Sequence, residues 1–470
     1  MVETDCRSFG QANFGGLDLG DARRTDRLAE LADTMCRHPS GTLPDKLPKP
    51  ADLRAFYRLM KCKEVTHESV MAGHTAATRQ EMGSASRAGQ VLLIIHDATE
   101  LDYTTLKSLE ENLGQIGQGT HRDYICHNSL VVQAEPQRVL GLASQILHHR
   151  ANVPKGETDT ERRERTDRES RLWVQGARQS GQAPPGSLWV DVSDTLSDTF
   201  EYMAFEVTQG RHFVLRSRED RKLATPVGSA GYLYEAVRQQ PSLTTYEVEV
   251  QGTTKRKART AIVHVSFTPV QIAPPGKRLG DYENQPLTLW AVRVWEPNPP
   301  AGAEALEWIL LTNVPVITVA DALQRIKWYE TRWVVEDYHK GMKTGCGIET
   351  MQFTQISRLE PAIAVLSALA TTLLKMRDAA RQPDADERPA TDCISEEYVA
   401  VLAAHYGSRL GKQPSILKFY MHVARLGGHQ NRKADGFPGW ITLWRGWMKL
   451  VNMAAGYCLG RSKRNKCGQT

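Results

Sequence analysis

The sequence predicts an α/β protein with a mixed central sheet and flanking helices, a β-rich insertion, and helical segments at both ends. Three observations lead to this prediction. Continuous apolar runs typical of buried strands lie between residues 91 and 194, and further strand-like runs fill the range 205–315. Segments with helix signals lie near both ends of the chain. Because 470 residues are too many for one hydrophobic core, we expect more than one domain.

The net charge permits a nucleic-acid partner but does not require one. Lysine and arginine number 59 against 54 acidic residues, a formal charge of +5. The eight cysteines are scattered without a C-x-x-C pair, so neither a zinc site nor a disulfide framework is predicted. We therefore expect reduced thiols and a cytoplasmic protein.

Membrane association is not expected. The first ten residues hold acids and no apolar core, so no signal peptide is predicted. The most apolar run, Ala362–Leu374, is too short to span a bilayer and is interpreted as a buried helix.

Residues 1–75 are predicted to form a basic helical domain. Asp21 is a plausible helix cap, and Arg23, Arg24 and Arg27 follow it on the first turns. Four more cations lie around the apolar residues of the next helical stretch: Arg54, Arg58, Lys61 and Lys63. Such a module suits the DNA backbone, and the alternative is an ordinary solvated helical domain.

A run of buried strands follows from Val91. The strand-like runs that begin at Val91, Ser129 and Val139 predict an antiparallel meander. A charged helical stretch, 157–179, separates them from a further buried strand, 187–194. Asp97 is predicted just past the end of the first of these strands, and the last strand finishes in Asp191 and Asp194.

A later segment, Tyr329–Lys343, is predicted to be one helix with a polar face. On such a helix Tyr329, Arg332, Glu336, Lys340 and Lys343 share an arc of about 80°. One carboxylate among cations suits a metal ligand surrounded by phosphate-binding groups. Strands carrying Asp, followed by a helix carrying Glu, resemble the layout of an RNase H-like nuclease core, in which carboxylates hold two divalent ions.

The remaining segments complete the predicted organisation. Five strand-like runs with basic tips form the insertion of about 205–315 within a catalytic domain of 76–376. Residues 377–392 read as a linker. A helical C-terminal domain, 377–470, carries the anchors Trp440, Leu443, Trp444 and Trp447 and a basic end.

The pattern Tyr329-x2-Arg332-x3-Glu336-x6-Lys343 resembles the signature of bacterial DDE transposases of the insertion sequence four family. Five further segments resemble the family in the same order along nearly the whole chain: LGDARRT from Leu19, HDATELDY from His96, HFVLRSR from His212, LEWILLT from Leu306 and ARLGG from Ala424.

The resemblance implies a role for each matching residue. Asp97, Asp194 and Glu336 correspond to the catalytic triad; Asp194 is chosen because Asp194-x3-Asp198-x3-Tyr202 fits the family pattern, with Asp191 as the competitor. The residues implied to grip DNA are Tyr329, Arg332, Lys340, Lys343, Arg216, Arg23, Arg24 and Arg27. Trp308 is implied to stack on a flipped base in a DNA hairpin, and the alternative is a core tryptophan on a strand.

The implied activity is cut-and-paste transposition. Two Mg²⁺ or Mn²⁺ ions held by the triad would support cleavage at inverted-repeat ends of double-stranded DNA and joining of the 3′-OH ends to target DNA. The C-terminal helices would form a homodimer interface. Two alternatives stay open: a plain RNase H-like nuclease, and a non-catalytic DNA-binding relative such as a domesticated protein or an inhibitor.

Overall fold

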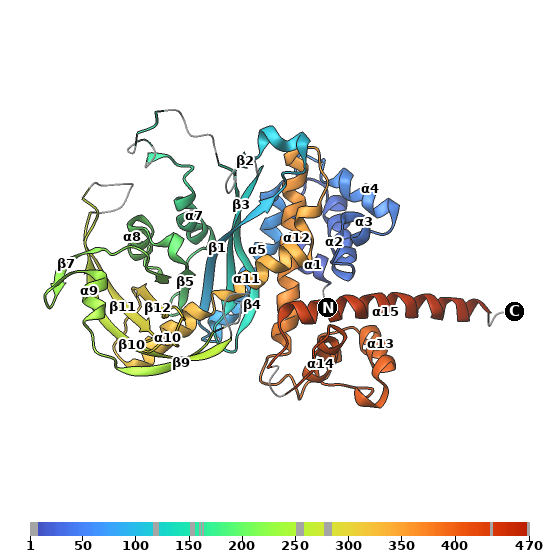
Figure 1. Cartoon of the computed structure of the whole chain (residues 1–470). Helices are drawn as coiled ribbons and strands as arrows, with labels where there is room; N and C mark the ends of the chain where they lie inside the picture. The colour runs from blue at the N-terminus through green and yellow to red at the C-terminus, as the bar shows by residue number, and fades with distance from the viewer. Residues whose placement is uncertain are drawn as a thin grey trace.

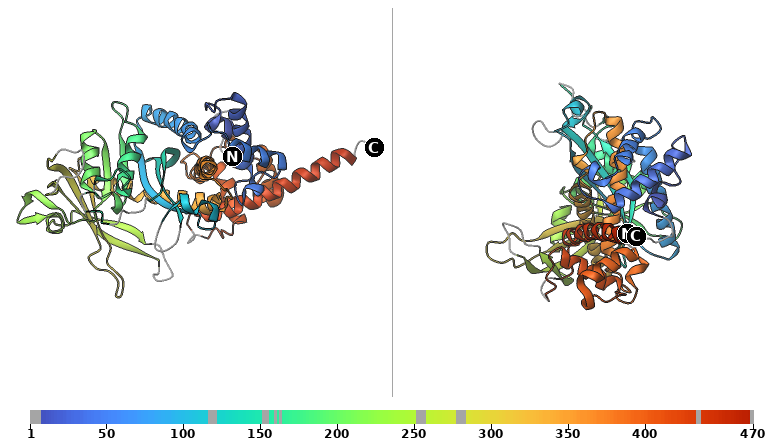
Figure 2. Two further views of the ribbon diagram at one scale, coloured as in Figure 1. Left: turned by 90° about the horizontal axis from the view of Figure 1, so that it is seen from above. Right: turned by 90° about the vertical axis from the view of Figure 1, so that its right-hand side faces the viewer.

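A single mixed sheet forms the middle of the protein (Figure 1). The computed structural model describes residues 8–115, 122–150, 156–158, 161, 164–250, 258–276, 284–432 and 436–467. The N-terminal helices lie on one side of the central strands and the β-rich region on the other, while the last helix projects away from the body (Figures 1 and 2). The predicted α/β class with helical ends is therefore confirmed.

Five strands make up the centre of the sheet, in the order β4-β3-β1-β5-β6: β1 (Leu92–Asp102), β3 (Arg122–Gln133), β4 (Arg138–His148), β5 (Trp189–Ser193) and β6 (His212–Arg216). The first three pair antiparallel, as the predicted meander requires. β5 runs parallel to β1, and β6 runs parallel to β5. The mixed sheet is confirmed, and its assignment to the RNase H-like class stays a prediction.

The β-rich region extends the same sheet rather than forming a separate one. β6 falls inside the range predicted for the insertion, yet it pairs with β5 at the centre. β12 then pairs with the free edge of β6, and the other strands continue outward. These are β7 (Lys222–Val227), β8 (Ala230–Tyr232), β9 (Thr244–Val250), β10 (Arg259–Ile272), β11 (Leu287–Trp295) and β12 (Glu307–Thr312), with β2 (Gly114–Gln115) at the other edge.

Short helices accompany the strands. α7 (Leu172–Ser180) covers β3 and β4, and it is shorter than the helix predicted over 157–179. The sequence did not indicate α8 (Phe200–Thr208) or α9 (Leu233–Arg238). The predicted basic tip at Lys255, Arg256 and Lys257 lies outside the described residues.

The N-terminal part consists of helices, as predicted: α1 (Phe9–Phe14), α2 (Ala22–Arg37), α3 (Leu43–Lys46), α4 (Pro50–Leu59) and α5 (His67–Arg87). Asp21 caps α2, its carboxylate accepting the Arg23 backbone N–H at 2.9 Å. The apolar stripe of α2, which includes Leu28, Leu31 and Met35, is buried in the main core. α5 continues past the predicted boundary at residue 75 and packs on β4 and α12.

The buried helix predicted around Ala362–Leu374 is confirmed as α12 (Ile356–Ala379). By length and composition alone this helix could cross a membrane, but 89% of its apolar window is buried inside the protein. It contacts α5 and β4 on one side and the C-terminal helices on the other, so it joins the three regions of the chain.

The C-terminal part holds α13 (Glu396–Tyr406), α14 (Ile416–Leu426) and α15 (Trp440–Cys467). The predicted anchors are buried at the start of α15, where the rings of Trp440 and Trp444 stack at 6.0 Å. The linker prediction was wrong. Arg377 lies inside α12, and the chain beyond it is tied to the start of α14 by Ala390 N–H to Pro414 O at 2.8 Å. This bonding leaves no extended connector.

Candidate functional site

Parallel pairing between β1 and β5 brings two of the predicted acids together. His96 and Ser193 are the last residues paired in register, so Asp97 and Asp194 follow them side by side. The prediction that Asp97 lies beyond a strand end was wrong, because β1 continues to Asp102 through its pairing with β3. Asp97 instead lies where the parallel half of the pairing stops.

The segment predicted as one helix is broken next to the site. α10 (Val319–Glu330) ends before Arg332, α11 (Trp333–Lys340) begins after it, and a π-helical turn, Gly341–Gly345, follows. At the break, backbone N–H groups bond three residues back, including Arg332 to Tyr329 and Val335 to Arg332, both at 3.0 Å. Bonds of this type turn the chain by about 120° per residue instead of 100°. The single-helix prediction was therefore wrong, and Tyr329 sits on a different helix from Glu336.

Arg332 lies among the three acids. Its Nη1 is 2.7 Å from Asp97 Oδ2 and 3.7 Å from Glu336 Oε1. The pKa of Asp97 is raised to about 7, mainly by burial and also by Asp194 and Glu336, against the opposing effect of Arg332. Burial also raises the pKa of Asp194. The structure thus brings the three predicted acids into one electrostatic cluster.

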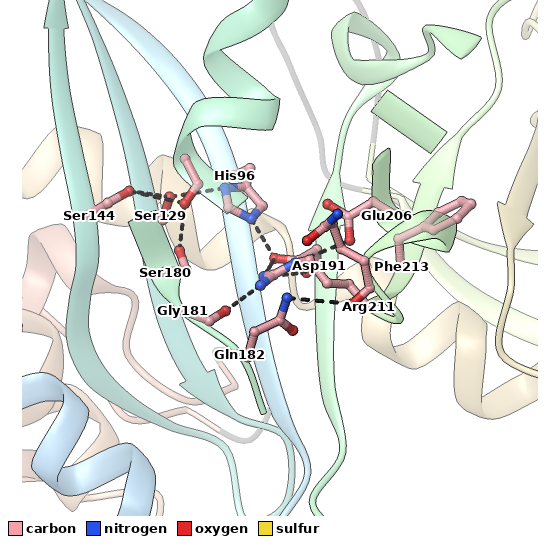
Figure 3. A network of polar contacts seen from close by, with 12 residues as sticks. His96, Ser129, Ser144, Ser180, Gly181, Gln182, Asp191, Glu206, Arg211 and Phe213 are labelled. Atoms are coloured by element: carbon pink, nitrogen blue, oxygen red, sulfur yellow. Dashed lines mark hydrogen bonds and ion pairs between the residues drawn. The ribbon is translucent and has the colours of Figure 1, made fainter. Parts of the chain in front are cut away.

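Asp191, the competing acid, belongs to a buried network instead (Figure 3). It accepts from His96 Nε2 at 2.6 Å and from Arg211 Nη2 at 2.7 Å, and His96 Nδ1 lies 2.9 Å from Ser129 Oγ. Although burial alone would raise the pKa of Asp191, Arg211 and His96 hold it below its ordinary value. Both carboxylate oxygens are engaged, so the geometry favours Asp194 as the acid available to a ligand.

Asp198, the middle residue of the Asp194-x3-Asp198-x3-Tyr202 pattern, also has a local structural contact. Its carboxylate accepts backbone N–H groups from Arg218 at 2.7 Å and Glu219 at 2.9 Å, and it forms an ion pair with Arg221. Asp198 therefore holds the loop after β6.

The donor set suits a divalent metal in kind. Carboxylate oxygens are the ligands that Mg²⁺ and Mn²⁺ prefer, and Asp97, Asp194 and Glu336 provide three of them. In this conformation, however, the three carboxylates are not close enough together to form a metal site. Across the described ranges, no three His, Cys, Asp or Glu side chains are grouped to hold a metal ion. Cys36, Cys62, Cys126, Cys346 and Cys393 are free thiols.

Several predicted DNA-gripping residues lie near the acids. Burial raises the pKa of Tyr329, and Arg332, Arg216 and Asp194 are its electrostatic neighbours. Arg216, on β6, donates to the Glu307 carbonyl at 3.4 Å, next to Trp308 on β12.

Trp308 and the two lysines differ in their surroundings. Trp308 is half-buried, and its Nε1 has no hydrogen-bond partner among the described residues. Lys343 Nζ lies 3.3 Å from Glu349, whereas Lys340 is exposed at the end of α11.

Two of the three N-terminal arginines have internal partners. Arg24 bonds the Leu19 carbonyl and Glu64, and Arg27 bonds Asp52 at 2.6 Å. Arg23 is exposed beside Asp21. Exposed cations of this part that the predicted site omitted include Arg54, Arg58, Lys61 and Lys63. Their clustering around α4 was the sequence signal for them.

Residues 6–65 match a family model described as Transposase DNA-binding. The match covers α1 to α4, the basic helical part of the chain. The protein therefore carries a transposase DNA-binding domain, which supports the predicted DNA partner.

The two aspartates should differ in their effect on stability. Asp191→Asn leaves Glu206 as the remaining acidic contact of buried Arg211, and burial disfavours the ionised form of Glu206, so we expect a loss of about 3–5 kcal/mol. Asp194→Asn removes a carboxylate whose ionised form is disfavoured by burial, so the free energy of unfolding at pH 7 should stay level or rise. Urea unfolding of both variants measures this. An equal loss of unfolding free energy in the two variants would contradict the conclusion that Asp191, and not Asp194, belongs to the buried network.

Proposed function

We propose that the protein is a DDE transposase of the cut-and-paste type. It binds the inverted-repeat ends of a transposon, cleaves their phosphodiester bonds and joins the 3′-OH ends to target DNA. The observation that carries the proposal is the convergence of Asp97, Asp194 and Glu336 around Arg332, in a chain with a transposase DNA-binding domain.

The acids and the residues around them have separate roles in the proposed reaction. Asp97, Asp194 and Glu336 would hold two Mg²⁺ or Mn²⁺ ions, which when bound supply an activated water and stabilise the leaving 3′ oxygen. Tyr329, Arg332, Lys340 and Lys343 grip the phosphates on either side of the scissile bond. Their positive charge offsets the negative charge that develops on the phosphate, and their fixed positions hold the strand in line for attack.

Trp308 receives a base displaced from the DNA stack. Its side chain packs against the core but is only half-buried, so part of the ring is left for a displaced base. Arg216, bonded to the neighbouring Glu307 carbonyl, contacts the backbone beside that base.

The C-terminal helix supports the proposed homodimer. α15 is anchored by buried tryptophans at its start and projects from the body (Figure 1 and the left view of Figure 2). A synaptic complex requires two protein copies to hold two DNA ends, and a projecting helix gives the second copy a surface to pack against. Such a complex would form on DNA in the cytoplasm.

A non-catalytic DNA-binding relative is the second candidate. One observation favours it: the acids are not grouped as metal ligands in the described conformation. The first experiment below separates the two candidates.

Removing either of two acids should abolish cleavage but not binding. Asp97→Asn and Glu336→Gln keep the side-chain shape while removing the charge that a divalent ion needs, so nicking of end-labelled substrate should stop. Gel-shift affinity for the same DNA should change little. Cleavage that continues in both variants, or in EDTA, would rule out the triad. An unmutated protein that binds ends but never cleaves with Mg²⁺ or Mn²⁺ would favour the non-catalytic candidate.

End binding should depend on the exposed cations more than on the paired ones. Arg54→Ala and Arg58→Ala each remove one exposed cation proposed to contact a phosphate, so the slope of log affinity against log salt should shrink by about one unit. Arg27→Ala is the matched control, because Arg27 is bound to Asp52. Fluorescence anisotropy at several salt concentrations measures the slopes. A larger change in slope for Arg27→Ala would mean that the paired arginines make the phosphate contacts.

Trp308→Ala should slow the hairpin step selectively. Unstacking a base costs a few kcal/mol, and stacking on an aromatic face returns about 1–3 kcal/mol. The first nick needs no flipped base, so it should be spared, while hairpin formation slows by about tenfold or more. Trp308→Phe keeps an aromatic face and is the control. Denaturing gels separate the products, and equal slowing of both steps would mean that Trp308 is a core residue only.

A further inference from the structure

Arg332 contacts Asp97 and lies close to Glu336, two of the acids that are proposed to hold a metal ion. Only 10% of its side chain is exposed, and its Nη1 lies 2.7 Å from Asp97 Oδ2 and 3.7 Å from Glu336 Oε1. The break between α10 and α11 fixes its backbone, and its guanidinium lies 5.0 Å from the centre of the Trp333 ring. The guanidinium therefore holds a carboxylate oxygen that a metal would need.

The same guanidinium is incompletely satisfied. Its Nε is buried and has no hydrogen-bond partner within the described part of the chain. A buried donor without an acceptor costs about 1–3 kcal/mol, so another partner for Arg332 would be favoured. Because a guanidinium presents several donors in one plane, it pairs best with a group that offers two acceptor oxygens, and a phosphodiester is such a group.

The Arg332 guanidinium and a divalent ion cannot both bind Asp97. A guanidinium on Asp97 repels a divalent ion and uses the lone pairs that the ion needs. If a DNA phosphate accepts the guanidinium, Asp97 loses its counter-charge beside Asp194 and Glu336, and the uncompensated carboxylates attract a divalent ion. The lack of grouped metal ligands among the described residues agrees with the first of these two states.

We propose that Arg332 is an internal counter-ion that blocks metal binding at Asp97 until the backbone of a DNA end accepts its guanidinium. DNA and metal then bind cooperatively, and each raises the affinity for the other by the same factor. The proposal rests on the proposed function, because it takes DNA as the ligand and the acids as metal ligands. It adds a regulation of that site: the protein without DNA is protected from loading metal and cutting unselected DNA.

The test measures metal binding, not turnover. Mn²⁺ affinity is followed by the electron paramagnetic resonance signal of free Mn²⁺, with the full chain and no DNA. Arg332→Gln removes the charge but keeps a hydrogen-bonding side chain, and it should bind Mn²⁺ about tenfold more tightly than the unmutated protein. Lys327→Gln is the matched control. It removes one charge from an exposed position on α10, and we expect no gain of that size.

A second measurement needs no variant. A duplex with a pre-cleaved end, carrying the inverted repeat that flanks the coding region, leaves no bond to hydrolyse. It should raise the Mn²⁺ affinity of the unmutated protein by at least about fivefold and that of Arg332→Gln by less. If the duplex leaves Mn²⁺ affinity unchanged, or Arg332→Gln binds Mn²⁺ no better than Lys327→Gln, the counter-ion proposal is wrong.

A double variant separates this proposal from the proposed function. Asp97→Asn combined with Arg332→Gln should lose the gain in Mn²⁺ affinity. If the double variant still binds tightly, the metal lies elsewhere and the proposed triad fails. If the unmutated protein shows metal-dependent cleavage while Arg332→Gln shows no gain in Mn²⁺ affinity, the proposed transposase function is supported and the counter-ion proposal is wrong.

Discussion

The arrangement of the site depends on the buried contact between His96, Asp191 and Arg211. This network joins β1 to β5, and Arg211 also connects to the end of α7 and to Glu206 on α8 (Figure 3). The register of two paired strands decides which face of the sheet each side chain occupies. A slip of one residue would turn every side chain to the other face. By fixing that register directly beneath Asp97 and Asp194, the network holds two mutually repelling carboxylates side by side.

Holding those carboxylates together costs stability. The ionised form of Asp97 is disfavoured by burial and by its acidic neighbours, and Arg332 and the Ala98 backbone N–H offset this at close range. Glu206, fully buried nearby, has a pKa well above its ordinary value because of burial and the adjacent Asp191. The apolar side chains of the surrounding strands and of α12 are buried in the core and supply the stability that tolerates these groups.

Particular residues show what could be predicted from the sequence. The runs at Val91 and Ser187 are apolar on both faces, which only a central strand explains, and the Asp21 cap and the tryptophans of α15 have local signals of their own. Asp191 and Asp194 could not be separated by position, because what distinguishes them is a partner, Arg211, that follows a turn and a helix later. The break at Arg332 also lacked a signal, since neither Gly nor Pro marks it.

Pairing partners were the general obstacle. Alternation predicts that β12 is a strand, but not that it adds to the edge of β6, so the continuous sheet could not be foreseen. The sequence likewise favoured Arg24 and Arg27 as DNA contacts. Their ion pairs with Glu64 and Asp52 could not be foreseen, because these partners lie far away in sequence.

The long last helix has a geometric consequence. α15 contains 28 residues, which at 1.5 Å each gives a rod about 42 Å long, and its buried apolar residues run from Trp440 to Ala454. A tilt of about 10° at its base would therefore displace its tip by about 7 Å. The packing of Trp440, Trp444 and Trp447 thus acts as a pivot, and a small volume change there, such as Trp to Phe, would be magnified into a large shift at the far end of the chain.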